Sequence, residues 1–155
     1  MTRAEMEYER DPEHWLKRLL PDEWIRAALS ELGRARVAFA AHNSSAALAS
    51  VKRAAGMALN GALIVRPSEA WGRTYAEHLK ALSDDALAPP AVREAARRLD
   101  LARSPSGELV VLRTKSDRDQ LLDAAQTVMA HAYAIVPNDA ETVVSQIARA
   151  TCQSA

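Results

Sequence analysis

Apolar side chains recur every three or four residues along most of the chain, which is the spacing that places them on one face of an α-helix. Proline, glycine, serine and asparagine interrupt this pattern and mark the ends of the helices. The pattern predicts helices at about residues 22–41, at about 45–65, from 66–69 to Ser83, from Pro89-Pro90 to Arg103, from Asp117 to Pro137, and at 139–151. The short apolar run at 108–114 has no second strand to pair with, so we expect an extended connector there.

The second predicted helix is the most distinctive, because small residues recur along it every four positions. These residues are Ala46, Ser50, Ala54, Ala58 and Ala62. Gly56 and Gly61 lie within the same helix, where each costs about 1 kcal/mol relative to alanine. Such glycines are tolerated where a neighbouring helix crosses closely. We therefore expect this helix at the centre of the fold.

The composition agrees with an all-helical fold. Hydrophobic residues make up 48% of the chain but aromatic residues only 5%, a mixture that favours closely packed helices over sheets. A chain of 155 residues forms one domain with a sizeable core. We predict an all-α, single-domain, up-and-down helical bundle of about five helices plus a short C-terminal helix. Residues 1–20 are expected to form a charged arm or short helix, residues 21–137 the bundle, and residues 138–155 the C-terminal helix and tail.

The charge of the chain limits its partners. The 20 basic and 20 acidic side chains give a formal net charge of zero, whereas proteins that hold nucleic acid through its phosphates usually have a basic excess or a basic face. The one local basic excess covers residues 93–118. Its candidate contacts for RNA or a nucleotide are Arg97, Arg98, Arg113 and Lys115. A solvated helix face and loop is the alternative interpretation of the same residues.

Cofactors and compartment follow from what the sequence lacks. Cys152 is the only cysteine, so neither an internal disulfide nor a zinc site of paired cysteines is expected. No glycine-rich phosphate loop occurs, and His14, His42 and His131 lack ligand-type neighbours, so we expect no metal and no cofactor. The N-terminus has no signal-peptide pattern, and no apolar run approaches the ~18–20 residues of a membrane span. We therefore expect a cytoplasmic protein that makes no membrane contact.

One pair of residues stands out as a candidate for catalysis. In the stretch WGRTYAEHL, residues 71–79, four residues separate Arg73 from His78. On a straight helix residues five apart diverge by about 140° around the axis, which places His78 on the apolar face and Arg73 toward solvent. One interpretation is a partly buried His78 bonded to a backbone carbonyl, with Arg73 on the surface near Glu77. The other is a catalytic pair that dimerisation or a break in the helix brings together.

The order of the elements carries a resemblance to a known family. An alanine-rich second helix contains Lys52, a His-Leu pair follows at His78-Leu79, and the connector LRTKSD contributes Arg113. Over about residues 22–137 this arrangement resembles the HEPN superfamily, the helical domains named for higher eukaryotes and prokaryotes nucleotide-binding proteins. Catalytic members carry an R-x4-6-H motif, usually at a later helix than here, and Arg73 with His78 has that spacing.

The resemblance implies a non-catalytic HEPN-like module that forms a homodimer or binds a partner, such as a nucleotidyltransferase or a toxin–antitoxin type partner. An alternative is a HEPN ribonuclease that needs no metal. In it His78 would act as general acid or base on a ribose 2′-hydroxyl, and Arg73 would stabilise the charge of the phosphorane. A third possibility is an unrelated helical bundle with a structural or adaptor role.

Overall fold

The computed structural model describes residues 8–102 and 115–136, and within these ranges the regular structure is helical. The elements are α1 (Pro21–Ala40), α2 (Ser44–Val65), the short 3-10 turn η2 (Glu69–Trp71), α3 (Tyr75–Asp84), α4 (Pro90–Leu101) and α5 (Lys115–Ile135). The predicted all-α fold with about five helices is confirmed. The expected connector at 108–114 and the expected C-terminal helix and tail at 138–155 lie outside the described residues.

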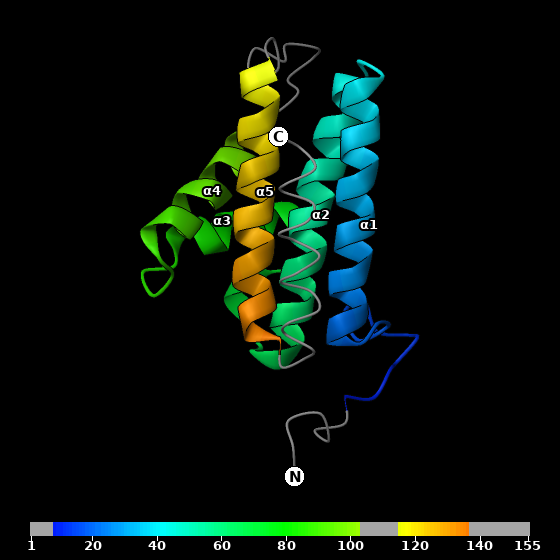
Figure 1. The fold of residues 1–155 in the computed structure, drawn as a ribbon. Coiled ribbons are helices and arrows are strands. Elements are labelled where there is room, and N and C mark those ends of the chain that lie inside the picture. Colours follow the sequence, from blue (N-terminus) through cyan, green and yellow to red (C-terminus); the bar gives the residue numbers. More distant parts are fainter. Residues whose placement is uncertain (1–7, 103–114, 137–155) are drawn as a thin grey trace.

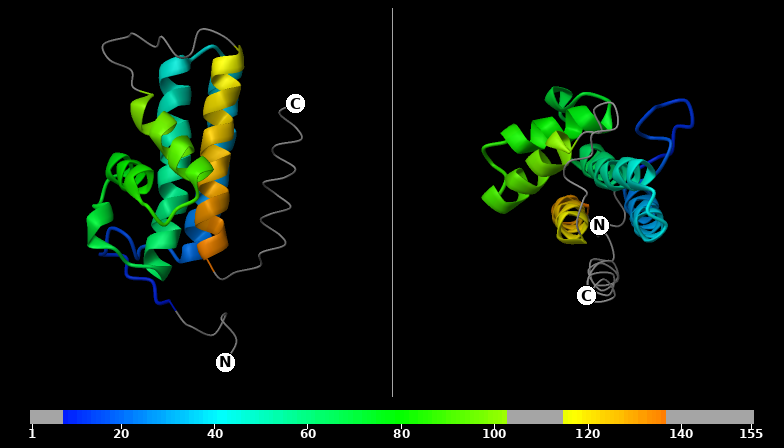
Figure 2. Two further views of the ribbon diagram at one scale, coloured as in Figure 1. Left: turned by 90° about the vertical axis from the view of Figure 1, so that its left-hand side faces the viewer. Right: turned by 90° about the horizontal axis from the view of Figure 1, so that it is seen from above.

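α2 is the centre of the bundle. The long helices α1, α2 and α5 run side by side, while α3 and α4 form a shorter pair against α2 and α5 (Figure 1; Figure 2). α2 contacts each of the other four α-helices, and its small residues Ala54, Ala58 and Ala62 are buried. These small side chains thus form packing surfaces inside the bundle, and α2 occupies the central place that the sequence predicted.

The two glycines of α2 mark its closest contacts with other elements. A Cβ atom at Gly61 would lie 2.8 Å from the carbonyl oxygen of Pro21, at the start of α1. A Cβ atom at Gly56 would lie 2.3 Å from a ring atom of Tyr75, at the start of α3. Neither distance leaves room for a methyl group, so both positions require glycine. Gly33 in α1 differs, because no atom lies within 4 Å of its Cβ position.

The third helix begins later than the sequence pattern predicted. A helix starting at 66–69 was expected, but the 3-10 turn ends at Gly72, whose positive φ of 66° reverses the course of the chain. α3 then starts at Tyr75 with Thr74 as its N-cap. The Thr74 hydroxyl accepts a hydrogen bond from the Glu77 backbone N–H at 3.1 Å and donates one to the Glu77 carboxylate at 2.9 Å. This reciprocal cap fixes the start of α3.

A buried carboxylate of α1 pairs with an arginine of α2. Glu31 in α1 is only 2% exposed, and it pairs with Arg53 of α2 at 2.7 Å and with Arg34 of its own helix at 3.2 Å. A buried charge of this kind is tolerated only when it is paired. The ion pair therefore joins α1 to α2 at one point along their shared contact.

α2 also meets a simple test for a membrane span, contrary to the expectation from the sequence. Among the described helices, Ser44–Val65 is long and apolar enough by length and composition, with a mean hydropathy of 1.2 over its most apolar window. However, 72% of that window is buried inside the bundle. Core helices of water-soluble bundles pass the same test, because burial against other helices also favours apolar residues.

Candidate functional site

His78 lies in the interior of the bundle with both ring nitrogens engaged. The side chain is 0% exposed and projects from α3 toward α2. Its Nδ1 lies 2.7 Å from the carbonyl oxygen of Trp71, and its Nε2 lies 2.7 Å from Oδ1 of Asn60 in α2. The expected bond from His78 to a backbone carbonyl is therefore present, and the histidine is more deeply buried than the sequence suggested.

The two bonds bear on the protonation of the ring. The Trp71 carbonyl can only accept a hydrogen bond, so Nδ1 carries a proton. Nε2 faces Oδ1 of Asn60, and a side-chain amide can serve this nitrogen either as an acceptor through its oxygen or as a donor through its NH2 group. Burial lowers the pKa of His78 against a smaller opposing effect of the Trp71 carbonyl and Glu77. Both ring nitrogens therefore have a polar neighbour within hydrogen-bond distance.

Three aromatic rings surround His78. The ring centroids of Trp15, Trp71 and Tyr75 lie 6.1, 6.5 and 6.5 Å from that of the imidazole. Trp15 belongs to the segment before α1, Trp71 to η2, and Tyr75 to the first turn of α3. Together with α2 they separate the histidine from solvent, which agrees with the lowered pKa of His78.

Arg73 lies in a different environment. It precedes α3 in the turn between Gly72 and Thr74, and its side chain is exposed. Its guanidinium carbon lies 5.8 Å from the centroid of the Trp15 ring, a cation–π contact. Within the described residues no hydrogen bond or ring contact joins Arg73 to His78. The break in the helix has thus directed the arginine toward the N-terminal segment rather than toward the histidine.

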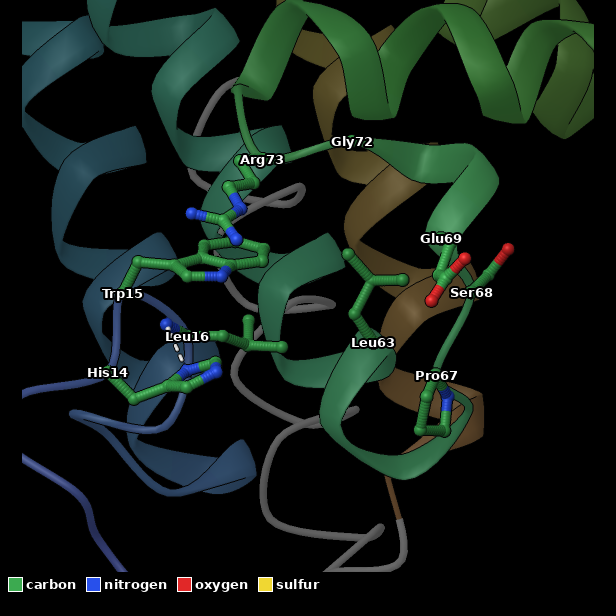
Figure 3. Close-up of a pocket in the computed structure, with 9 residues that line it drawn as sticks. All are labelled: His14, Trp15, Leu16, Leu63, Pro67, Ser68, Glu69, Gly72 and Arg73. Atoms are coloured by element: carbon green, nitrogen blue, oxygen red, sulfur yellow. Dashed lines mark hydrogen bonds between the residues drawn. The ribbon is translucent and has the colours of Figure 1, made fainter.

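Arg73 lines a cavity of about 480 Å³ between the N-terminal segment and the connection from α2 to α3. Its walls combine apolar, aromatic and charged side chains (Figure 3). The lining residues are His14, Trp15, Leu16, Leu63, Pro67, Ser68, Glu69, Gly72 and Arg73. In the close-up, Trp15 with Arg73 above it forms one side of the space, and Glu69 and Ser68 lie across from it (Figure 3). The volume lies within the ~300–1,000 Å³ range of small-molecule sites.

The N-terminal wall of the cavity is held in place by hydrogen bonds. The described residues 8–20 contain no α-helix, so of the two expected forms, an arm or a short helix, these residues adopt an arm. The Trp24 indole N–H donates to the Leu16 carbonyl at 2.8 Å, and Arg10 donates to the Glu23 carboxylate at 2.8 Å. The Arg10 guanidinium also lowers the pKa of Glu23. The arm is therefore anchored on the first turn of α1.

The predicted basic contacts are dispersed and mostly paired. Arg97 forms an ion pair with Glu94 at 3.0 Å, and Arg98 donates to the side chain of Gln120 at 3.2 Å. Lys115 is exposed at the first residue of α5. Arg113 lies outside the described residues. Within the two described ranges, no group of three or more histidine, cysteine or acidic side chains is arranged to hold a metal ion.

Sequence reasoning missed two residues that define these environments. Asn60 could have been found, because a single amide inside an otherwise apolar stretch of helix needs a buried hydrogen-bond partner. Trp15 gave no local signal, because its contacts with Arg73 and His78 join segments that are far apart in the sequence.

Comparison with known proteins adds the family. The sequence profile described as the HEPN domain matches residues 21–135, which covers α1 to α5 and most of the chain. No curated protein and no solved structure matches the chain. The match excludes the unrelated helical bundle that the sequence left open, and its bounds agree with the resemblance expected over about 22–137. Because the matched range contains all five described α-helices and most of the chain, the chain belongs to the HEPN domain family.

Proposed function

We propose that the protein is a non-catalytic HEPN module that acts by binding, as a homodimer or with a protein partner such as a nucleotidyltransferase or a toxin–antitoxin type partner. The observation that carries the proposal is the environment of His78. Both ring nitrogens are already bonded, to the Trp71 carbonyl and to Asn60, and the side chain is 0% exposed.

A general acid or base must reach the proton that it transfers, within a hydrogen-bond distance of the substrate atom. In this fold His78 would have to break a buried hydrogen bond and leave its aromatic surroundings before it could meet a ribose hydroxyl. Arg73 would have to leave Trp15 to approach the same substrate. Both movements oppose cleavage by this pair, and this supports a binding role.

The location of the small residues narrows where a partner would bind. Most small residues of α2 are used inside the bundle: Ala54, Ala58 and Ala62 are buried, and the glycines of the same helix lie against the start of α1 and against Tyr75. A dimer or partner contact therefore uses other elements. The outer surface of α1 is one candidate for this contact. Val37 is 70% exposed on it, and interfaces cover apolar side chains of this kind.

The experiment that tests the proposal combines an activity assay with a measurement of assembly. The full chain is incubated with structured and single-stranded RNA, and its mass in solution is measured by light scattering over a range of concentrations. We expect no cleavage, together with either a dimer mass or specific co-purification of a protein from the native cell. A monomer without any enriched partner would contradict the binding role.

The second candidate function is metal-independent RNA cleavage by Arg73 and His78. One observation favours it: Arg73 lies in the turn before α3, so the helix does not fix the direction of its exposed side chain, and its contact with Trp15 is the one interaction with a described residue that it would have to give up. Cleavage that persists in a chelator and is lost in both Arg73→Ala and His78→Gln would establish this function and overturn the first. Arg26→Ala is the matched control, since it removes another exposed arginine, one on α1 that is not among the candidate RNA contacts.

A further inference from the structure

One wall of the cavity beside Arg73 comes from residues that lie outside the family match. His14, Trp15 and Leu16, which form one wall, precede residue 21, where the family match begins. The opposite wall comes from the connection between α2 and α3, with Pro67, Ser68 and Glu69. The matched range therefore does not account for the whole of this site, and its function must be argued from its own side chains.

The cavity contains two opposite charges that do not pair with each other. Arg73 and Glu69 both line it, yet no ion pair or hydrogen bond joins either of them to another charged group among the described residues. Glu31 and Glu23, by contrast, each pair with an arginine. A cation and an anion held apart across one cavity favour a ligand that brings the complementary charges itself.

Arg73 is positioned for such a ligand. Its guanidinium lies over the Trp15 ring, and this contact uses the flat face of the group. The N–H donors at the edge of the guanidinium remain available, and in pairs they match the two oxygens of a carboxylate. His14 adds a donor to the same wall. Because its Nδ1 accepts from the backbone N–H groups of Leu16 and Lys17, at 3.0 and 3.2 Å, its Nε2 carries the proton.

The space between the charges is apolar. Leu16 and Leu63 are 8% and 5% exposed and contribute to the same lining as Pro67 (Figure 3). The arm that supplies Leu16 is fixed by the indole of Trp24, so this surface exists before any ligand binds. Preformed sites lose less entropy on binding than sites that must become ordered.

We propose that this cavity binds a small zwitterion with an apolar body, of the class of apolar amino acids and short apolar peptides, with its carboxylate on Arg73 and its ammonium group on Glu69. The apolar part of the ligand covers Leu16 and Leu63. A nucleotide or another phosphate ester fits less well. The Glu69 carboxylate repels the phosphate dianion, and such a ligand offers no cationic group that Glu69 could bind.

The test uses the full chain and measures the binding of leucine and the dipeptide leucyl-leucine by calorimetry, with protein-observed NMR for weak affinities. Two blocked compounds separate the charges: N-acetyl-leucine lacks the ammonium group, and leucinamide lacks the carboxylate. We expect at least one of the two zwitterions to bind at millimolar concentration or below, and both blocked forms to bind about tenfold or more weakly, as expected for the loss of a charge-assisted hydrogen bond.

Substitutions of Arg73 and Glu69 test which residue binds each charged group of the ligand. Arg73→Ala and Glu69→Gln are expected to weaken binding of the zwitterion about tenfold or more, whereas Arg97→Ala leaves it unchanged. All three side chains are exposed, so we expect each variant to remain folded. The thermal midpoint of each variant checks this. Glu69→Arg should reverse the preference and favour N-acetyl-leucine over leucine.

Three results would overturn the proposal: no binding of either zwitterion at millimolar concentration, equal binding of the blocked forms, or tighter binding of adenosine monophosphate than of the zwitterions. None of them bears on RNA cleavage or on the mass of the protein in solution. The ligand site and the proposed binding function therefore stand or fall separately.

Discussion

His78 and Arg73 lie five positions apart and contact different parts of the molecule. His78 projects into the bundle, where α2 supplies Asn60 as its partner and solvent is excluded. Arg73 lies on the surface against an arm that precedes the first helix. The positive φ of Gly72 and the Thr74 cap between them separate the two environments. A sequence spacing that fits a catalytic pair can therefore join one residue that maintains the core and one that faces a cavity.

The largest expected difference between the two regions is in stability. His78→Ala should lower the free energy of unfolding by about 2–4 kcal/mol, because it leaves a cavity and removes the partner of the Trp71 carbonyl and of Asn60. Urea denaturation followed by circular dichroism measures the change. Arg73→Ala, measured in parallel, should cost far less. Similar losses in the two variants would remove the contrast between a core residue and a surface residue.

A second test concerns the contact that holds the start of α3 against α2. Gly56→Ala should destabilise the protein by about 1–3 kcal/mol, because the added Cβ would overlap the Tyr75 side chain. Gly33→Ala is the matched control. It adds the same methyl group where nothing lies within 4 Å, so it should stabilise the helix by up to about 1 kcal/mol. Thermal denaturation should show changes of opposite sign, and a change of the same sign in both would disprove the close packing at Gly56.

The pH dependence of stability distinguishes the two regions in another way. Burial lowers the pKa of His78 from its usual value of about 6.5, so below that pH the unfolded chain binds a proton that the folded chain does not. Stability should therefore fall as the pH falls below about 6.5, by at most about 1.4 kcal/mol per pH unit for this group, until the folded-state pKa is reached.

His78→Gln should flatten this dependence, and Arg73→Ala should leave it unchanged. The measurement is the free energy of unfolding at several values between pH 7.5 and pH 5, values chosen to span the usual histidine pKa of about 6.5. His131, whose pKa burial also lowers, contributes in the same direction, and His131→Gln separates its share. An unchanged slope in His78→Gln would show that another group is responsible.

The smallest expected effect is that of Arg73 itself on stability. Its cation–π contact with Trp15 is exposed, and such contacts contribute about 0.5–1 kcal/mol. Arg73→Ala should change the free energy of unfolding by no more than this, but it should alter the tryptophan fluorescence, because the charge above the Trp15 ring is lost. Arg73→Lys should retain part of both properties. A loss well above 1 kcal/mol in Arg73→Ala would indicate that the arginine has a structural role in the core.

The fold was predictable because local signals agree with the packing. The proline at the first position of α1, the Asn43 cap of α2 and the small residues of α2 each act within one helix or one turn. The start of α3 was predicted too early, although Gly72 followed by Thr74 and Glu77 has the pattern of a turn and a capping box. The apolar spacing of Trp71, Tyr75 and His78 continued through the break and hid it.

The environment of the candidate site was less predictable than the helices. The burial of His78 followed from its place on an apolar face, and the bond to a backbone carbonyl was expected. Its partner Asn60 lies 18 positions away, and the contact of Trp15 with Arg73 spans 58 positions, which no helical periodicity encodes. Such contacts depend on how the connections cross the ends of the helices, and residue spacing carries little information about that.

The anchored arm also bears on what counts as the smallest folding unit. A fragment cut at the family boundary, residue 21, would lack the Leu16 carbonyl that satisfies the indole of Trp24, a side chain that is 1% exposed in the intact chain. It would also lack Arg10, the partner of Glu23. The arm thus completes the packing and hydrogen bonding at the start of α1 and is part of the folded domain. A substitution in the arm would therefore alter both the packing at the start of α1 and the wall of the cavity that contains Arg73.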